Sequence, residues 1–152
     1  MIAARAPEAE QRATVVAEAR SWLRTPWHHE ARVKDAGVDC ANFLIGVYAA
    51  CGLAPEFTPE QYPPDWMLHR DEEKFLKHLL QYTRPVEEGL PGDIAMFRFG
   101  RTVSHGAIVV DWPTVIHAYY DERMVVLTDV STSPRLTGYF AGFYRLKEWG
   151  TS

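Results

Sequence analysis

The sequence predicts an α+β fold in which helices precede an antiparallel sheet. Apolar residues recur at helical spacing in the first half, whereas short runs rich in Val, Ile, Phe and Tyr follow residue 89. The connections between these runs are short and rich in turn residues, which is typical of antiparallel neighbours. A chain of 152 residues can bury a core of its own, so we expect one domain over residues 1–152.

Three helices are expected. Residues 8–23 carry an apolar stripe with charged residues largely elsewhere, which marks an amphipathic helix. Residues 41–51 are apolar at nearly every position, as in a helix buried on all sides. A third helix is expected over residues 69–82. Residues 24–38 and the proline-rich residues 53–66 are expected to be loops.

Five strands are expected in the second half, and they form a meander because their connections are short. The runs that predict them are residues 93–99, 105–111, 114–119, 124–129 and 141–146.

Composition excludes several functions. The net charge of -4 argues against a nucleic-acid partner, which needs a basic surface to neutralise phosphates. No run of about 18 apolar residues predicts membrane insertion, and residues 1–11 lack the apolar stretch of a secretory signal. We therefore expect synthesis in the cytoplasm as a soluble protein. Cys40 and Cys51 are expected to be free thiols rather than a disulfide framework.

Cys40 is the candidate nucleophile. Asp39 is a good N-cap for the buried helix, which places Cys40 in its first turn. The helix dipole and unpaired backbone N–H groups at that position favour a thiolate and can stabilise an oxyanion. The alternative is that Cys40 is a small buried hydrophobe, a reading that fits Cys51 better.

His105 and His117 are the candidate base and its orienting partner. They lie 12 residues apart on runs joined by a short turn, and a hairpin of this kind brings two imidazoles side by side. One ring can accept the thiol proton while the second fixes its tautomer. A histidine on each strand can also be an ordinary half-buried residue.

Zinc is a competing use of the same three side chains. A metal site would need a fourth ligand or a catalytic glutamate, and the nearby candidates are His28, His29 and Glu30.

Several separated motifs agree with one family. They are residues 25–29 (TPWHH), 38–42 (VDCAN), 91–97 (PGDIAMF), 104–109 (SHGAIV) and 115–118 (VIHA). In order and spacing they resemble the NlpC/P60 papain-like cysteine peptidases over roughly residues 14–146. Residues 29–40 and 113–118 most resemble the subset found in tailed phages and phage-derived gene transfer particles.

The resemblance implies a papain-like fold with the nucleophile at the start of the central helix. It implies a triad of Cys40, His105 and His117 that cleaves peptidoglycan stem peptides between D-glutamate and a diamino acid. Neither a cofactor nor a metal is implied. The expected partners are the stem peptide and the proteins of a phage-like tail tip or baseplate, with action in the periplasm or at the cell wall.

The resemblance assigns Asp39, Trp27 and Ser104 to substrate binding. The family commonly has Tyr in place of Trp27, whose indole can donate only through its N–H. It also favours Ser and Gly where this chain has Ala41 and Asn42. These departures keep two alternatives open: an amidase or acyltransferase on the same fold, and a catalytically silent wall-binding or structural tail component.

Overall fold

The protein is described here by a computed structural model that covers residues 6–56, 71–99 and 102–150, without the side chains of residues 71–75 and 102–104. The α-helices are α1 (Glu8–Ser21), α2 (Cys40–Ala50), α3 (Asp71–Leu80) and α4 (Pro134–Tyr139), and the 3-10 turns are η4 (Tyr120–Glu122) and η5 (Val130–Thr132). The strands are β1 (Arg32–Val33), β2 (Gly37–Val38), β3 (Thr83–Val86), β4 (Ile94–Phe99), β5 (Thr102–Asp111), β6 (Thr114–Tyr119), β7 (Met124–Asp129) and β8 (Phe140–Leu146).

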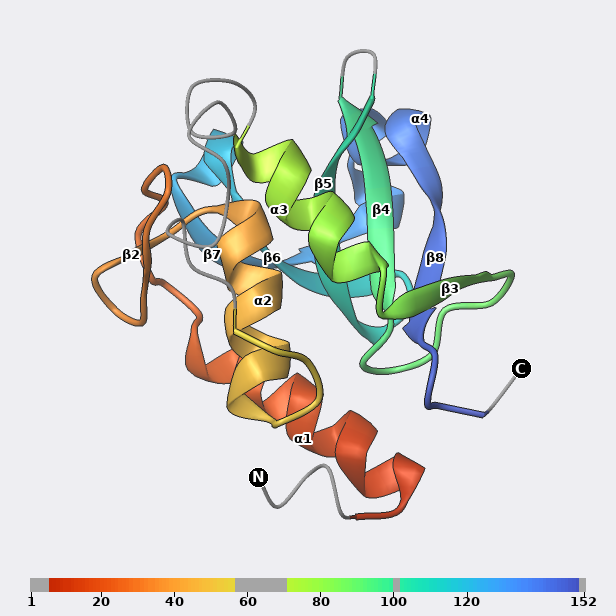
Figure 1. Cartoon of the computed structure of the whole chain (residues 1–152). Coiled ribbons are helices and arrows are strands. Elements are labelled where there is room, and N and C mark those ends of the chain that lie inside the picture. Colours follow the sequence, from red (N-terminus) through yellow and green to blue (C-terminus); the bar gives the residue numbers. More distant parts are fainter. Residues whose placement is uncertain (1–5, 57–70, 100–101, 151–152) are drawn as a thin grey trace.

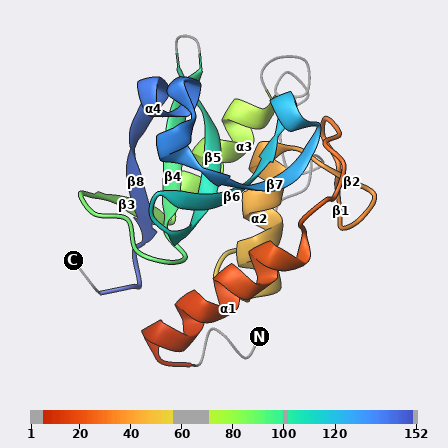
Figure 2. The same ribbon diagram turned by 180° about the vertical axis from the view of Figure 1, so that it is seen from behind.

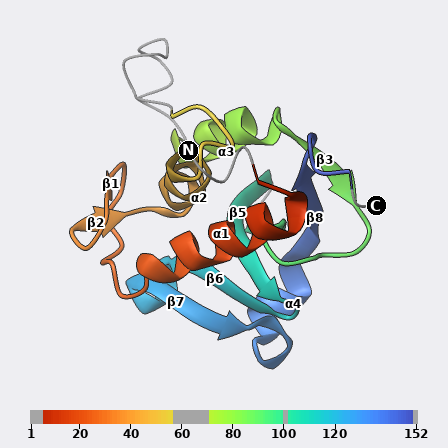
Figure 3. The same ribbon diagram turned by 90° about the horizontal axis from the view of Figure 1, so that it is seen from below.

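One antiparallel sheet organises the fold. Its strand order is β3-β8-β4-β5-β6-β7, so β4 to β7 form the expected meander and β8 returns to lie between β3 and β4. Helices α2 and α3 cover one face of the sheet, and α1 runs across one end of it (Figure 1). Helix α4 lies on the opposite face, which Figure 2 shows from behind and Figure 3 shows from below. The fold is therefore α+β, as expected.

Side-chain alternation divides the buried residues between the two faces of the sheet. One set packs with α1, α2 and α3, and its sheet members include Ile94, Met96, Ile108, Ile116 and Ala118. The other set packs with Leu136 of α4, and its sheet members include Ala95, Phe97, Ala107, Val109 and Val115. Both faces of β4, β5 and β6 are thus covered, which explains their nearly continuous apolar sequences.

Close packing of α2 on β5 depends on Gly106. A Cβ built at Gly106 would lie 2.7 Å from Cδ1 of Leu44 and 3.1 Å from Sδ of Met96. Any larger residue would push the helix from the strand, so glycine sets the distance between the two elements.

The expected count of five strands was wrong, because β3 adds a sixth. The sequence hid this strand, since Arg84 and Pro85 read as the end of a helix. Pro85 lacks the backbone N–H that a central strand needs, but β3 is an edge strand that pairs with β8 alone. The expected loop over residues 24–38 also contains the short antiparallel pair β1 and β2.

The helix predictions are confirmed apart from their ends. Helix α2 begins at Cys40, with Asp39 as its N-cap, and the chain leaves it through Gly52 at a left-handed φ of 74°. Helix α3 ends at Leu80 rather than at the expected residue 82, and residues 57–70, which include residues 57–66 of the expected proline-rich loop and the expected start of this helix, lie outside the described residues. Among helices in the described part of the chain, none has the length and apolar character of a membrane span.

A buried ion network ties α1 to β8 and to Asp93, the residue before β4. The fully buried carboxylate of Asp93 accepts from Nη1 of Arg12 at 3.0 Å and from Nη2 of Arg145 at 2.7 Å. The backbone N–H of Leu90 also donates to it, at 2.9 Å. The carboxylate therefore pairs with two buried guanidinium groups, and Oε2 of Glu8, 2.9 Å from Nε of Arg12, supplies the second negative charge.

We expect Asp93→Asn to lower the free energy of unfolding by about 3–5 kcal/mol, because it leaves buried guanidinium charge without its counter-charge. Urea unfolding followed by circular dichroism measures this loss. Asp111→Asn is the control, since Asp111 is exposed and should change stability by about 0.5 kcal/mol or less. Equal losses in the two variants would contradict a stabilising role for the network.

Candidate active site

The first turn of α2 is held by the side chain of Asp39. This carboxylate is buried, and its Oδ1 accepts from the backbone N–H of Asn42 at 2.9 Å and from Nδ2 of the same residue at 3.0 Å. Its Oδ2 accepts from the backbone N–H of Glu30 at 2.7 Å. The expected N-cap is confirmed, and it fixes Cys40 as the first helical residue.

A second layer of hydrogen bonds supports this cap. Nε of Arg32 donates to Oδ1 of Asn42 at 2.9 Å, and Nη1 of Arg32 lies 3.4 Å from Oε2 of Glu56. The β1-β2 pair is thus joined to the start of α2 by side chains. Sequence reasoning noticed Asn42 as a departure from the family pattern but missed its partner Arg32, because nothing in a linear sequence signals a contact across a loop.

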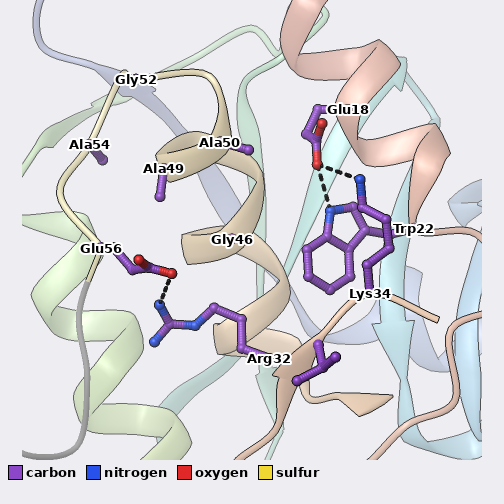
Figure 4. A pocket seen from close by; sticks show the side chains of 11 residues that line it. Glu18, Trp22, Arg32, Lys34, Gly46, Ala49, Ala50, Gly52, Ala54 and Glu56 are labelled. Carbon is purple, nitrogen blue, oxygen red and sulfur yellow. Dashed lines mark hydrogen bonds and ion pairs between the residues drawn. The ribbon is translucent and has the colours of Figure 1, made fainter. Parts of the chain in front are cut away.

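The same arginine borders a cleft of about 740 Å³ beside the C-terminal half of α2. Figure 4 shows the small residues of α2 between two walls, one with Trp22, Lys34 and Glu18 and the other with Arg32 and Glu56. Each wall carries one cation and one carboxylate, and Lys34 contacts Glu18 at 2.9 Å. The cleft lies away from the first turn of α2, so it is distinct from the region around Cys40.

His105 and His117 form a direct hydrogen bond. Nε2 of His105 lies 2.7 Å from Nδ1 of His117, as expected for two imidazoles on neighbouring strands. Nε2 of His117 lies 3.0 Å from Oγ1 of Thr128 on β7. We refer to His105 and His117 together as the histidine pair. Thr128 was missed by sequence reasoning and extends the pair into a chain of three side chains.

The histidine pair is uncharged in the folded protein. Both rings are buried, and burial together with the Arg135 guanidinium lowers the pKa of His105 to about 3. Burial and the neighbouring His105 lower the pKa of His117 well below its ordinary value, against a smaller raising effect of Asp121. Because unfolding frees these rings to bind protons, their contribution to stability is lost as pH falls from about 6.5 toward 3.

The pair lies on the α4 face of the sheet. His105 is in register with Phe97 of β4 and contacts Phe97, Phe99 and Tyr119, which belong to the aromatic set of that face or pack against it. Its neighbour Gly106 turns the other way and meets α2. The expectation that the two imidazoles lie together is confirmed, and they lie on the face opposite the one on which the middle of α2 packs.

Helix α2 begins with Cys40. The start of α2 and the start of β5 lie at the same end of the molecule, where β4 and β5 are joined (Figure 1). The thiol is buried. The pairing of Cys40 with His105 stays a prediction.

The substrate-binding assignments have different structural settings. Trp27 is half-buried, and its backbone forms an isolated parallel β-bridge with Val38, beside the start of α2. Its ring packs edge-on against Tyr120, with 4.9 Å between ring centres. Both oxygens of the Asp39 carboxylate accept the hydrogen bonds of the helix cap described above. Ser104 belongs to β5, and its side chain lies outside the described residues. Their roles toward a substrate remain predictions.

Cys51 and metal binding were the remaining questions raised by the sequence. Cys51 is a free, buried thiol at the end of α2, and burial raises its pKa to about 11, which fits the unreactive role expected for it. Within the described residues, no three His, Cys, Asp or Glu side chains gather as a metal site would require.

The comparisons with known proteins concern the fold. No protein-family model matches the sequence, and no curated protein matches it. Solved structures do match. An NLP/P60 family protein from Staphylococcus aureus, described as similar to lipoprotein, superposes with a TM-score of 0.68 at 17% identity over 92% of this chain. The fold is that of NlpC/P60 domains.

Two further structures carry functional descriptions. The peptidoglycan hydrolase RipB from Mycobacterium tuberculosis matches 97% of this chain and 71% of its own length, with a TM-score of 0.64 and 18% identity. An N-acetylmuramoyl-L-alanine amidase from Bacteroides uniformis matches 91% of this chain and all of its own length, with a TM-score of 0.60 and 10% identity. The chain spans 42% of the length of the S. aureus protein.

We expect Asp39→Ala to lower the free energy of unfolding by about 1–2 kcal/mol, because it removes the cap and strands three N–H donors. Asp39→Asn should cost less than half as much, since it keeps an acceptor oxygen at the cap. Urea unfolding of the two variants beside the parent measures both losses. A smaller loss for alanine than for asparagine would contradict the capping role.

Proposed function

We propose that the protein is a peptidoglycan hydrolase that cuts stem peptides through Cys40, His105 and His117. The observation that carries the proposal is the buried hydrogen bond between the two imidazoles, 2.7 Å long, in a fold whose central helix begins at a cysteine. The NlpC/P60 fold and the descriptions of its structural neighbours support the substrate class. The sequence motifs around each of the three residues support the same assignment.

The hydrogen bonds are compatible with the tautomer that a base requires. When Nε2–H of His105 donates to Nδ1 of His117, and Nε2–H of His117 donates to Thr128, the lone pair of His105 is on Nδ1. That nitrogen then accepts the proton of the Cys40 thiol, and the sulfur attacks the scissile carbonyl to form a thioester. The imidazolium returns the proton to the leaving amine. Water, activated by the same ring, hydrolyses the thioester and restores the thiol.

The orientation of the pair defines how Cys40 meets it. The middle of α2 packs on the face of β5 opposite the histidine pair, where Leu44 meets Gly106. In the proposed mechanism the thiol therefore approaches His105 from the first turn of α2, at the end of the helix near the β4-β5 connection. The positive end of the α2 dipole at that turn then favours the negative charge of the oxyanion.

The finer parts of the proposal rest on the sequence motifs. They favour cleavage between D-glutamate and a diamino acid, and delivery to the wall in a phage-like tail tip. Antibody detection of the chain in purified tailed particles from its source, with none in the particle-free fraction, is the expected outcome. Its presence in the particle-free fraction alone would remove the tail assignment and leave the hydrolase.

An amidase is the second candidate. The structural neighbour described as an N-acetylmuramoyl-L-alanine amidase favours it, because that protein matches over its whole length. The two reactions share a thioester intermediate and differ in the bond presented to the sulfur. Mass spectrometry of digested muropeptides separates them, since an amidase releases an intact stem peptide from the sugar whereas the peptidase shortens the stem.

We expect Cys40→Ala to abolish release of fragments from purified muropeptides. Cys51→Ala is the matched control, because Cys51 lies at the other end of the same helix and should leave the release nearly unchanged. His105→Ala should be about as damaging as Cys40→Ala, since members of a triad act as a unit. Release that survives Cys40→Ala would exclude the thiol from the mechanism, and no release by the parent chain would favour a silent wall-binding component.

We expect iodoacetamide at pH 6–7 to modify Cys40 faster than Cys51. The pKa of Cys51, raised by burial to about 11, leaves almost no thiolate at these pH values, whereas a helix N-terminus favours the thiolate of Cys40. Peptide mapping by mass spectrometry gives the rate at each cysteine in one sample. Faster modification of Cys51 would show that Cys40 is not the activated thiol.

A further inference from the structure

A guanidinium lies above the aromatic ring that covers His105. The guanidinium carbon of Arg135, in α4, is 4.1 Å from the centre of the Phe99 ring. The Phe99 ring is stacked on His105, with 5.2 Å between ring centres and 18° between planes. A positive charge therefore approaches the candidate base with one aromatic ring as an intermediary.

The same arginine is joined to the other imidazole by a second route. Arg135 is paired with Asp121 of η4, and the Tyr119 hydroxyl interacts with both of these charged groups. The Tyr119 ring is stacked on His117, with 4.5 Å between ring centres and 19° between planes. The contacts thus form a closed ring: Arg135 meets Phe99, which stacks on His105, and the hydrogen bond to His117 leads through Tyr119 back to Arg135. We call these four surrounding side chains the clamp: Phe99, Tyr119, Asp121 and Arg135.

We propose that Arg135 is a positioning residue that holds the histidine pair through the clamp and opposes protonation of His105. This inference rests on the proposed function for the catalytic role of the pair, but not for its geometry or its charge. Nothing in the family resemblance assigns a role to Arg135, and α4 was not expected from the sequence.

The charges around the pair support this role. The titratable and charged groups of the described residues that face the pair or its clamp are Tyr119, Asp121, Arg123, Arg135 and Tyr139. Arg135 lowers the pKa of His105, whereas Asp121 raises the pKa of His117. The cation therefore opposes protonation of the ring that must accept the thiol proton, and the carboxylate favours charge on its partner.

The role is separable from stability. The side chains of Arg135 and Asp121 are 44% and 43% exposed, and ion pairs at such exposure contribute little to the free energy of unfolding. Removing Arg135 should therefore leave a folded protein in which the histidine pair has changed.

The chemistry of the guanidinium also matters. Its planar fork can lie over Phe99 while it binds Asp121 and Tyr119, which a lysine ammonium cannot match in geometry. Arg135→Lys keeps the charge and loses the fork, and Arg135→Gln loses both, so the two variants separate charge from positioning.

The first test is an NMR titration of the histidine rings in the Cys40→Ala background, from pH 8 down to the onset of acid unfolding. We expect both rings of the pair to stay neutral from pH 8 to 5 in that background and the pKa of His105 to rise in Arg135→Gln. Arg123→Gln is the matched control, because it removes the same charge near the same turn, where Arg123 lies over Tyr120 at 4.2 Å. An unchanged His105 titration in Arg135→Gln, or an equal shift in Arg123→Gln, would overturn the proposal.

The second test is steady-state cleavage of muropeptides by chains that retain Cys40. We expect Arg135→Lys to lower kcat by about 10-fold with KM nearly unchanged, since a displaced base slows the chemical step without altering ground-state binding. An unchanged kcat in Arg135→Lys would remove the positioning role. If the parent chain cleaves nothing, the proposed function fails while the titration still decides whether Arg135 controls the charge of the pair.

Discussion

The alternation of side chains along β5 is the constraint on which the rest of the structure depends. From His105 to Val109, successive residues of this strand face α4 and α2 in turn, and a shift of one residue in register would exchange the two sets. Gly106 faces Leu44 and lets α2 lie close to the strand, while its neighbour His105 turns toward Phe99. The same register places His105 against His117, because both rings point to the α4 face.

Buried polar groups in this fold are stabilised in two different ways. Asp39 and Asp93 are ringed by N–H donors, from backbone and side chains at the first and from two guanidinium groups at the second. The histidine pair is buried as deeply but remains neutral, with each ring supplying a hydrogen-bond partner for the other. The carboxylates therefore fix the start of α2 and the start of β4, whereas the histidine pair can still change its protonation state.

Sequence reasoning succeeded where one short segment contains the whole physical cause. The Asp39 cap and the buried helix after it are local features, and the spacing of 12 residues between His105 and His117 follows from a short hairpin. The motifs also led to the NlpC/P60 fold, although no family model matches the chain and the reported structural neighbours are at most 18% identical.

What could not be predicted depends on contacts between distant segments. Pro85 argued against a strand, and its tolerance follows from the place of β3 at the edge of the sheet, which a linear sequence does not contain. Nothing in the linear sequence marks Arg32 or Arg135, and only the fold brings them to Asn42 and Asp121. The sequence also does not tell on which face of the sheet the histidine pair lies. Alternation divides the side chains of a strand into two faces, but it does not say which face packs against α2.

A neutral pair sets the conditions under which Cys40 reacts in the proposed mechanism. An imidazole whose pKa is about 3 is a poor acceptor for the proton of a thiol whose ordinary pKa is about 8.5, so transfer is unfavourable while the ring stands alone. The transfer becomes easier when the thiolate stays beside the new imidazolium, because opposite charges at short range offset the penalty of burial. The first turn of α2 stabilises the thiolate further. Substrate that displaces water strengthens both attractions, so the ion pair should be more populated in the substrate complex than in the free protein.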